Sequence, residues 1–228
     1  IRRLNHASYV IAANEVMERW LVDHGLTAMH SYLGFHDYLC PATPVLKTNM
    51  EPWALTYAGS LNMRKNAFML EFSSIGMPLF LYGYLGSYDA AQLDVSLITE
   101  LGYTSPEQFI ATAQGDFGLV WDGPRLDSCS GDWGEYLALN TPHKCSFYIR
   151  AHLPLVMWSG AAMASEVRRR NIGICVDSLR ELPDRLVRIT RKEYDAMKAN
   201  VASLAEELAN GRQMAGAVTL ACQRLNKA

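Results

Sequence analysis

Short apolar segments alternate with helical patterns over most of this chain, and this alternation constrains the fold most. The apolar segments are rich in Leu, Val, Tyr and Phe and show no polar alternation, which indicates strands buried on both faces. Such strands separated by helices predict an α/β fold with a doubly wound, mostly parallel, Rossmann-like sheet. The expected strands are Trp53–Ala58, Pro78–Tyr82, Val95–Leu101, Phe117–Trp121, Leu155–Trp158 and Ile172–Val176, and the expected helices are Pro106–Ala113, Pro142–Ala151 and Ala161–Arg170.

A separate strand–helix–strand pattern precedes this region. The apolar run Ala7–Ala13 is followed by Asn14 as an N-cap, a helix that ends at Gly25, and an extended stretch near Leu26–Leu33. A single unit of this size is too small to bury a core of its own. We interpret it as the last part of a larger N-terminal domain, the alternative being a decoration on a single domain. The proline-containing stretch Cys40–Pro52 is predicted to be a linker.

Composition and charge exclude several classes of protein. The net charge is −2, whereas nucleic-acid binders usually carry a basic surplus, so no nucleic-acid partner is expected. The basic run Arg168–Arg170 is interpreted as the C-terminal end of a helix and a solvated face. No apolar run is long enough to span a bilayer, and no signal-peptide pattern opens the sequence.

The five cysteines are widely spread and include no CxxC motif. This pattern favours reduced thiols in the cytoplasm over disulfides or a zinc site. Most are expected in the core, and Cys129, in a polar segment, is expected to be the most exposed. Peripheral attachment to the inner face of a membrane stays open.

The absent motifs narrow the chemistry. The sequence has no GxGxxG, no P-loop, no GxSxG, no HExxH and no Asp-x-Asp. The first absence argues against a dinucleotide-dependent epimerase or dehydrogenase. A sugar transferase without closely spaced carboxylates is expected to need no metal, and must neutralise a diphosphate with cations, backbone N–H groups and helix N-termini.

Two predicted strand ends could contact a ligand. Gly59 and Ser60 follow the first strand of the sheet and precede two cations, Arg64 and Lys65. This segment could bind an anion or form an ordinary turn. Tyr82 ends the next strand, where ligands of open parallel sheets bind, and could flank a nucleobase or ribose. The alternative for Tyr82 is a core tyrosine with a satisfied hydroxyl.

The richest segment runs from Asp116 to Ser159. A buried strand leads into a long loop of Gly, Asp and Ser residues, which is predicted to be functional. Asn140 or Thr141 is the expected N-cap of the next helix, with Pro142 at its first position. His143 and Lys144 then lie in the first turn, where the helix dipole disfavours cations unless an anion is bound. Lys144 is therefore interpreted as a phosphate contact rather than a solvated lysine, whereas His143 could also cap or pack.

The segments WDG, CSG, WGEYL and NTPHKCSFYIRAHLPLVMWSGAAMASEV resemble a bacterial glycosyltransferase family of GT-B fold. This family includes β-1,6-galactofuranosyltransferase-like proteins and the nucleotide-sugar-synthetase-like glucosyltransferases of streptococcal adhesins. The resemblance implies two Rossmann-like domains, of which the C-terminal one binds a UDP-sugar. It suggests the following division: residues 1–50 as the tail of the N-terminal domain and the linker, 51–190 as the donor domain, and 191–228 as helices packing across the domains.

The resemblance also implies the site residues. Donor contacts carried over to this sequence are Gly59, Ser60, Tyr82, Asn140 and Lys144, with Tyr136 and Ser146 as weaker candidates. Most acceptor contacts and any catalytic base of the N-terminal domain would precede Ile1. The expected substrates are a UDP-sugar and a glycan or glycoprotein acceptor.

Two functions remain open at this point. The first is a metal-independent transferase that moves a hexose, such as galactofuranose or glucose, with inversion or retention undecided. The second is a non-catalytic nucleotide-binding subunit that stabilises a partner glycosyltransferase. Self-association is not decided by the residues.

Overall fold

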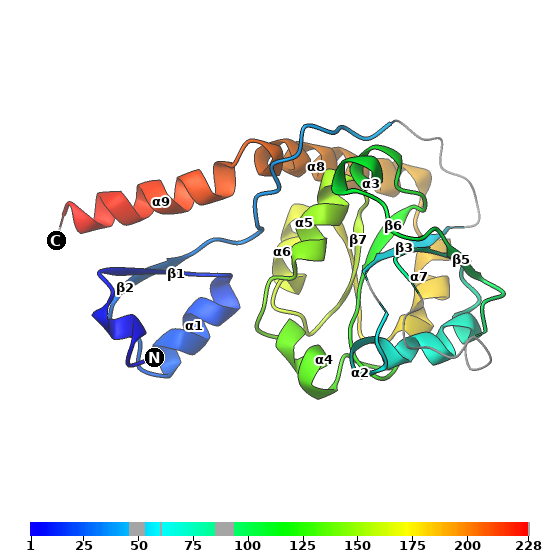
Figure 1. Cartoon of the computed structure of the whole chain (residues 1–228), viewed down its shortest axis with the longest axis horizontal. Coiled ribbons are helices and arrows are strands. Elements are labelled where there is room, and N and C mark those ends of the chain that lie inside the picture. The colour runs from blue at the N-terminus through cyan, green and yellow to red at the C-terminus, as the bar shows by residue number, and fades with distance from the viewer. Residues whose placement is uncertain (46–52, 60, 85–93, 228) are drawn as a thin grey trace.

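The computed structural model describes residues 1–45, 53–59, 61–84 and 94–227 and consists of a small N-terminal unit beside a larger α/β unit (Figure 1). The larger unit contains a six-stranded sheet in which every pair of neighbouring strands is parallel. Helices flank this sheet, so the predicted α/β class with a parallel Rossmann-like sheet is confirmed. The strand order is β5-β4-β3-β6-β7-β8.

The observed strands lie inside the six predicted segments. β3 and β4 follow one another in the chain and pair in the sheet. The longest expected strand, Val95–Leu101, is observed as the three-residue edge strand β5. The residues of β3, β6 and β7 are almost all buried, as the continuous apolar pattern predicts. The bounds are β3 Leu55–Ala58, β4 Leu79–Tyr82, β5 Ile98–Glu100, β6 Phe117–Val120, β7 Leu155–Trp158 and β8 Gly173–Val176.

The N-terminal unit has the predicted strand–helix–strand order. It comprises η1 Leu4–His6, β1 Tyr9–Ala12, α1 Glu15–Asp23 and β2 Met29–Tyr32. The two strands pair in parallel. Asn14 caps α1 as predicted, because its side chain accepts a hydrogen bond from the Met17 backbone N–H at 2.9 Å.

Helices connect the strands of the larger unit. The helices predicted around residues 106–113, 142–151 and 161–170 are confirmed with shorter ends, and basic residues close α6 as expected. Their bounds, with those of the remaining helices, are α2 Met63–Asn66, η2 Ala67–Ile75, α3 Pro106–Thr112, α4 Gly131–Leu137, α5 His143–Arg150, α6 Ala164–Arg170, η3 Leu179–Glu181 and α7 Leu182–Val187.

Two helical segments differ from the sequence prediction. The glycine-rich stretch expected to be one long loop contains α4, whose Gly134 packs so closely on Cys129 that a Cβ would lie 2.4 Å from its backbone carbon. Gly134 therefore serves helix packing rather than chain flexibility. The segment with η3 and α7 was also not expected, although a capping box between Ser178 and Glu181 marks its start.

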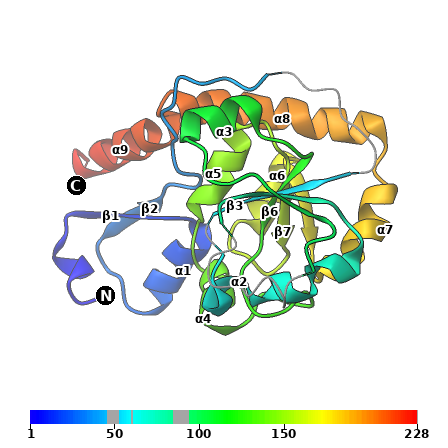
Figure 2. The same cartoon turned by 45° about the vertical axis from the view of Figure 1, so that its right-hand side comes forward.

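Two C-terminal helices join the two units. α8 (Arg191–Ala209) crosses one end of the larger unit and packs on α5, and α9 (Arg212–Leu225) continues along β1 and β2 (Figures 1 and 2). The two helices are separated by Asn210 and Gly211, with Gly211 at φ 70°. One face of α8 is buried and includes Tyr194, Met197, Val201 and Leu204.

The segment between the units is held by one buried cation. Residues 40–45 of the predicted linker have neither helix nor strand, and residues 46–52 lie outside the described residues. Arg150, at the end of α5 and 4% exposed, donates hydrogen bonds to the carbonyl oxygens of Tyr38, Cys40 and Ala42. These contacts fix the start of the linker against α5.

The expectation for Cys129 is wrong. Its side chain is buried where α4 packs over it, and Cys222 on α9 is the exposed cysteine. The polar residues around Cys129 indicated an exposed loop, but the segment that follows forms α4 and covers the Cys129 side chain. Among the described residues, no helix is both long and apolar enough to cross a membrane.

Candidate functional site

A buried polar cluster lies where β3 and β6 end. Tyr57 belongs to β3, and Asp122 follows β6 by two residues and is only 5% exposed. The Tyr57 hydroxyl donates to Asp122 Oδ1 at 3.3 Å, and Asn66 Nδ2 donates to the same oxygen at 3.2 Å. Carboxyl ends of parallel strands meet at one edge, which is where open α/β sheets bind ligands.

Two lysines converge on the Asp122 carboxylate. Lys144 Nζ lies 3.5 Å from Oδ1, and Lys65 Nζ lies 3.7 Å from Oδ2. Lys144 also donates to the Tyr57 hydroxyl at 2.9 Å and lies 4.1 Å from the centre of the Tyr57 ring. Burial and the neighbouring Lys144 ammonium lower the pKa of Lys65. Two cations against one carboxylate leave a net positive charge, which suits an anionic ligand.

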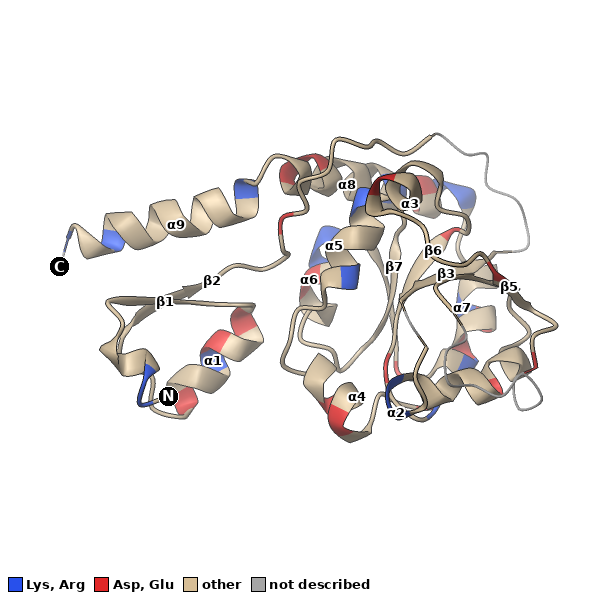
Figure 3. Cartoon of the chain, viewed as in Figure 1, with Lys and Arg blue, Asp and Glu red and all other residues tan. Residues whose placement is uncertain are grey.

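The start of α5 adds to this positive charge. The helix begins at His143 with Pro142 at the N-cap, so the predicted cap at Asn140 or Thr141 is wrong. Within the part of the chain that the structure describes, no side chain caps α5. Basic residues lie on α2, which follows β3, and on α5, which follows β6 and α4 (Figure 3). The positive end of the α5 dipole therefore faces the same region as the two lysines.

A mainly aromatic cavity of about 350 Å³ opens beside this cluster. Gly59 and Gly83 directly follow β3 and β4, with φ 139° and 150°, backbone conformations that favour glycine. The rings around the cavity come from four segments of the larger unit, and they are Tyr82, Tyr84, Tyr103, Phe109 and Phe147. This shape and lining suit a flat, partly apolar ring.

Tyr82 is a core tyrosine that also lines the cavity. Its hydroxyl accepts a hydrogen bond from the Gln114 backbone N–H at 2.8 Å, and the side chain is 7% exposed. Burial raises the pKa of this hydroxyl. The ring packs edge-on against Phe109 at 4.8 Å and forms part of the cavity wall. Tyr82 is thus a satisfied core tyrosine with one face toward the cavity.

The remaining predicted site residues are placed differently. Tyr136 is about half exposed on α4, and Asn140 is partly buried in the turn before α5, with its N–H donating to the Tyr136 carbonyl. Ser146 on α5 is fully buried, and no partner for its hydroxyl lies in the described part of the chain. Ser60 lies outside the described residues. Of the predicted set, Gly59 and Tyr82 line the cavity, Lys144 belongs to the polar cluster, and Asn140 lies in the turn that leads into α5.

Sequence reasoning missed the residues that hold Lys144. Tyr57 lies inside an apolar strand and Asn66 at the end of a helical turn, so neither position differs visibly from an ordinary core position. Asp122 carried the stronger signal, because it is a carboxylate directly after the apolar segment Phe117–Trp121. Its pairing with Lys144, 22 positions further along the chain, depends on tertiary structure.

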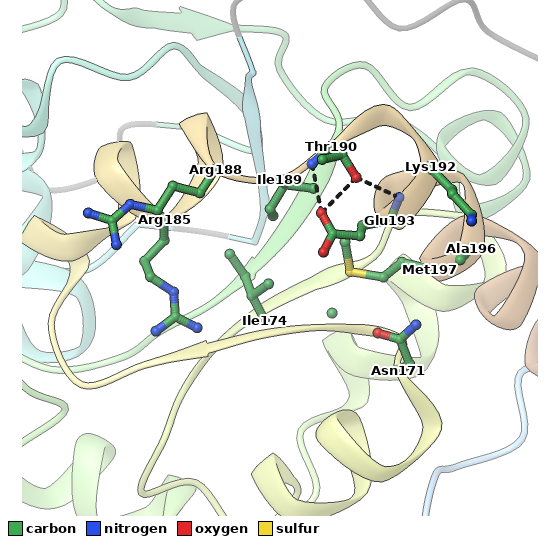
Figure 4. Close-up of a pocket in the computed structure, with 11 residues that line it drawn as sticks. Asn171, Ile174, Arg185, Arg188, Ile189, Thr190, Lys192, Glu193, Ala196 and Met197 are labelled. Atoms are coloured by element: carbon green, nitrogen blue, oxygen red, sulfur yellow. Dashed lines mark hydrogen bonds between the residues drawn. The ribbon is translucent and has the colours of Figure 1, made fainter.

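Two other cavities of the described residues lie away from the Lys144 cluster. One of about 740 Å³ lies between the start of β8, α7 and α8, at the opposite edge of the sheet (Figure 4). Arg185 and Arg188 point apart there, and Lys192 lies across the cavity. Glu193 is engaged by Thr190 in the cap of α8. A smaller cavity of about 140 Å³ lies between the N-terminal unit and α6.

The described residues contain no group of three or more His, Cys, Asp or Glu side chains placed to hold a metal ion. This observation does not test metal independence, which stays a prediction from the sequence. The geometry combines a positively charged, partly buried cluster with an aromatic cavity at the same edge of the sheet.

Comparisons with known proteins agree with this architecture. The family model described as glucosyltransferase 3-like, C-terminal domain, matches residues 55–221. The β-1,6-galactofuranosyltransferase WbbI of Escherichia coli (strain K12) is 28% identical over 220 residues, which cover 92% of this chain and 62% of WbbI. Glucosyltransferase 3 of Streptococcus gordonii is 27% identical over 201 residues, or 86% of this chain and 56% of that protein. The chain thus spans about three fifths of these relatives' length.

Solved structures share the fold at low identity. AviGT4, a glycosyltransferase involved in avilamycin A biosynthesis, matches with a TM-score of 0.60 and 13% identity, over 98% of this chain and 67% of that chain. Anabaena HepE, solved in complex with UDP-glucose, matches with a TM-score of 0.54 and 14% identity, over 97% of this chain and 63% of HepE. These similarities place the fold among GT-B glycosyltransferases.

Proposed function

The chain belongs to the glucosyltransferase 3-like, C-terminal domain family, and on that premise we propose that it forms the UDP-sugar site of a glycosyltransferase. The donor would bind at the carboxyl edge of the six-stranded sheet. The observation that carries this proposal is the convergence of Lys144 and Lys65 on one buried carboxylate next to the uncapped start of α5. The names of WbbI and Glucosyltransferase 3, and the UDP-glucose complex of HepE, support a sugar-nucleotide ligand.

The diphosphate would lie over the start of α5. Lys144 supplies a cation that is already oriented, with a side chain only 12% exposed. Lys65 supplies a second cation from α2, the helix after the Gly59 turn. First-turn N–H groups of α5 add hydrogen-bond donors and the positive end of the helix dipole. Together these groups balance a diphosphate without requiring a metal ion.

The uracil and ribose would occupy the aromatic cavity. Tyr84 and Tyr103 are exposed at the cavity and offer ring faces, whereas Tyr82 and Phe109 line it as buried side chains. The exposed backbone of Gly59 is accessible for polar contacts. The end of β3 connects this cavity with the lysine cluster, because Tyr57 belongs to the cluster and Ala58 and Gly59 line the cavity. One ligand with a ring at one end and a diphosphate at the other fits that arrangement.

Transfer of the sugar breaks the bond between the anomeric carbon and the β-phosphate oxygen. Negative charge then builds on the leaving UDP, and groups that bind this charge more strongly in the transition state accelerate the reaction. Lys144, Lys65 and the α5 dipole are placed for that task. We propose a hexose as the transferred sugar and a glycan or glycoprotein as the acceptor.

Nucleotide selectivity tests this proposal directly. Calorimetric titration with UDP, GDP and CDP should show binding of UDP and weaker binding of the other two, because the cavity discriminates by ring size and edge pattern. Circular dichroism of the same sample confirms that the chain is folded. A folded sample to which UDP adds no heat or thermal stabilisation would rule out a donor site here.

A further inference from the structure

One side chain of the N-terminal unit reaches the loop that leads into α5. Asn14 is 2% exposed, and its Oδ1 caps α1 by accepting from the Met17 N–H. Its Nδ2 donates to the Leu139 carbonyl at 2.9 Å and to Thr141 Oγ1 at 3.0 Å. Both amide protons are therefore used outside the helix that Asn14 caps.

Thr141 is held to the N-terminal unit by further contacts. It is 1% exposed, its hydroxyl lies 3.3 Å from the Ala13 carbonyl, to which it can donate, and His36 Nε2 lies 3.1 Å from its carbonyl oxygen. The rings of His36 and His143 also stack, with centroids 4.3 Å apart. Residues on both sides of β2 thus hold the turn before α5.

α5 has no side-chain cap because its N-cap residue, Pro142, has no side-chain acceptor. Thr141 is the type of residue that caps helices, but its hydroxyl is turned toward Asn14 and Ala13. Thr141 lies one residue after Asn140 and three before Lys144. The direction in which α5 and its first-turn groups point is therefore set by the N-terminal unit.

We propose that Asn14 and Thr141 are positioning residues of the donor site, which hold the 139–144 segment in the conformation that binds the diphosphate. The inference rests on the proposed donor function for its binding readout, but the restraint on this segment is measurable without a ligand. Because coupling is reciprocal, a diphosphate bound at α5 also strengthens the attachment of the N-terminal unit.

Asn14→Asp separates the two tasks of this residue. Aspartate caps a helix as well as asparagine does, so α1 keeps its cap, but the two N–H donors to Leu139 and Thr141 are lost. Thr141→Val removes the hydroxyl at nearly constant volume, and Thr141→Ser restores it. Asn200→Asp is the matched control, because it removes a similar amide bond, to the Asn171 carbonyl, from the exposed surface of α8.

Two measurements on these variants test the proposal. Asn14→Asp and Thr141→Val should accelerate amide hydrogen exchange in residues 139–145 and weaken UDP binding about tenfold, whereas Thr141→Ser and Asn200→Asp should match the wild type. Melting temperatures identify any variant that is not folded. Unchanged exchange in a folded Asn14→Asp chain overturns the inference, as does UDP affinity equal to wild type. If the folded wild type binds no UDP, the proposed donor function is contradicted, and the positioning role that depends on it is contradicted as well.

Discussion

Lys144 Nζ lies 3.5 Å from Asp122 Oδ1 and 2.9 Å from the Tyr57 hydroxyl, so the cation assigned to the donor phosphate is fixed before any ligand binds. Fixing a long side chain in advance lowers the entropy cost of binding. The second cation, Lys65, offsets the repulsion that Asp122 would otherwise exert on an incoming phosphate. The buried carboxylate therefore organises the site without cancelling its positive charge.

Asp122→Asn tests this organising role. The change leaves two lysines near each other without a counter-charge, and removing one partner of a buried ion pair costs about 3–5 kcal/mol. Because Lys65 is about a third exposed, we expect the lower end of this range in urea unfolding. Asp127→Asn, which removes an exposed partner of Arg180, should cost less than about 1 kcal/mol. Equal losses in the two variants would contradict a buried, organising Asp122.

Gly59→Ala tests the backbone conformation at the end of β3. A φ of 139° is strained for alanine, so this variant should lose about 1–2 kcal/mol of unfolding free energy and bind UDP more weakly. Gly216→Ala is the control, since Gly216 lies inside α9 and a Cβ added there would meet no atom within 4 Å. That variant should gain about 0.5–1 kcal/mol. A stabilised Gly59→Ala chain would show that the turn needs no glycine.

The strand pattern and the α5 cation could be predicted from the sequence because both depend on local features. Continuous apolar runs identify β3, β6 and β7, and two basic residues after Pro142 identify an unusual helix start. The caps and partners could not be predicted. Thr141 is a residue type that caps helices, yet its hydroxyl accepts a hydrogen bond from Asn14, 127 positions away. Tyr57 of β3 donates a hydrogen bond to Asp122, which follows the neighbouring strand β6. Such contacts arise only when distant segments fold together.

Tyr103→Ala separates the ring cavity from the phosphate cluster. Tyr103 is 73% exposed at the cavity, so its removal should leave folding unchanged. Loss of one stacking partner should weaken UDP binding by about 1–3 kcal/mol. Binding of inorganic pyrophosphate, which has no ring, should stay the same in parallel titrations. Equal weakening of both ligands would mean that the ring does not bind in this cavity.

The His36–His143 contact predicts a pH dependence of stability. Burial, then the neighbouring His143, lower the pKa of His36 below 6.5, against opposing effects of Thr141 and Asp37. The unfolded chain therefore binds more protons near that pH, and the free energy of unfolding should fall as the pH drops below 6.5. Urea unfolding at pH 7.5 and 5.5 should show a larger drop for wild type than for His36→Gln. An identical drop in both chains would show that His36 does not cause the pH dependence of stability.

The donor-site account is tested most directly by calorimetric titration of UDP, with and without magnesium, into the wild type, Lys144→Ala and Lys192→Ala. Lys192 is an exposed lysine at the opposite edge of the sheet and serves as the charge-matched control. We expect wild-type binding that does not require magnesium, a loss of about 1.5–3 kcal/mol in Lys144→Ala, and no loss in Lys192→Ala. Binding that depends on magnesium, or equal affinity of Lys144→Ala and wild type, would contradict it.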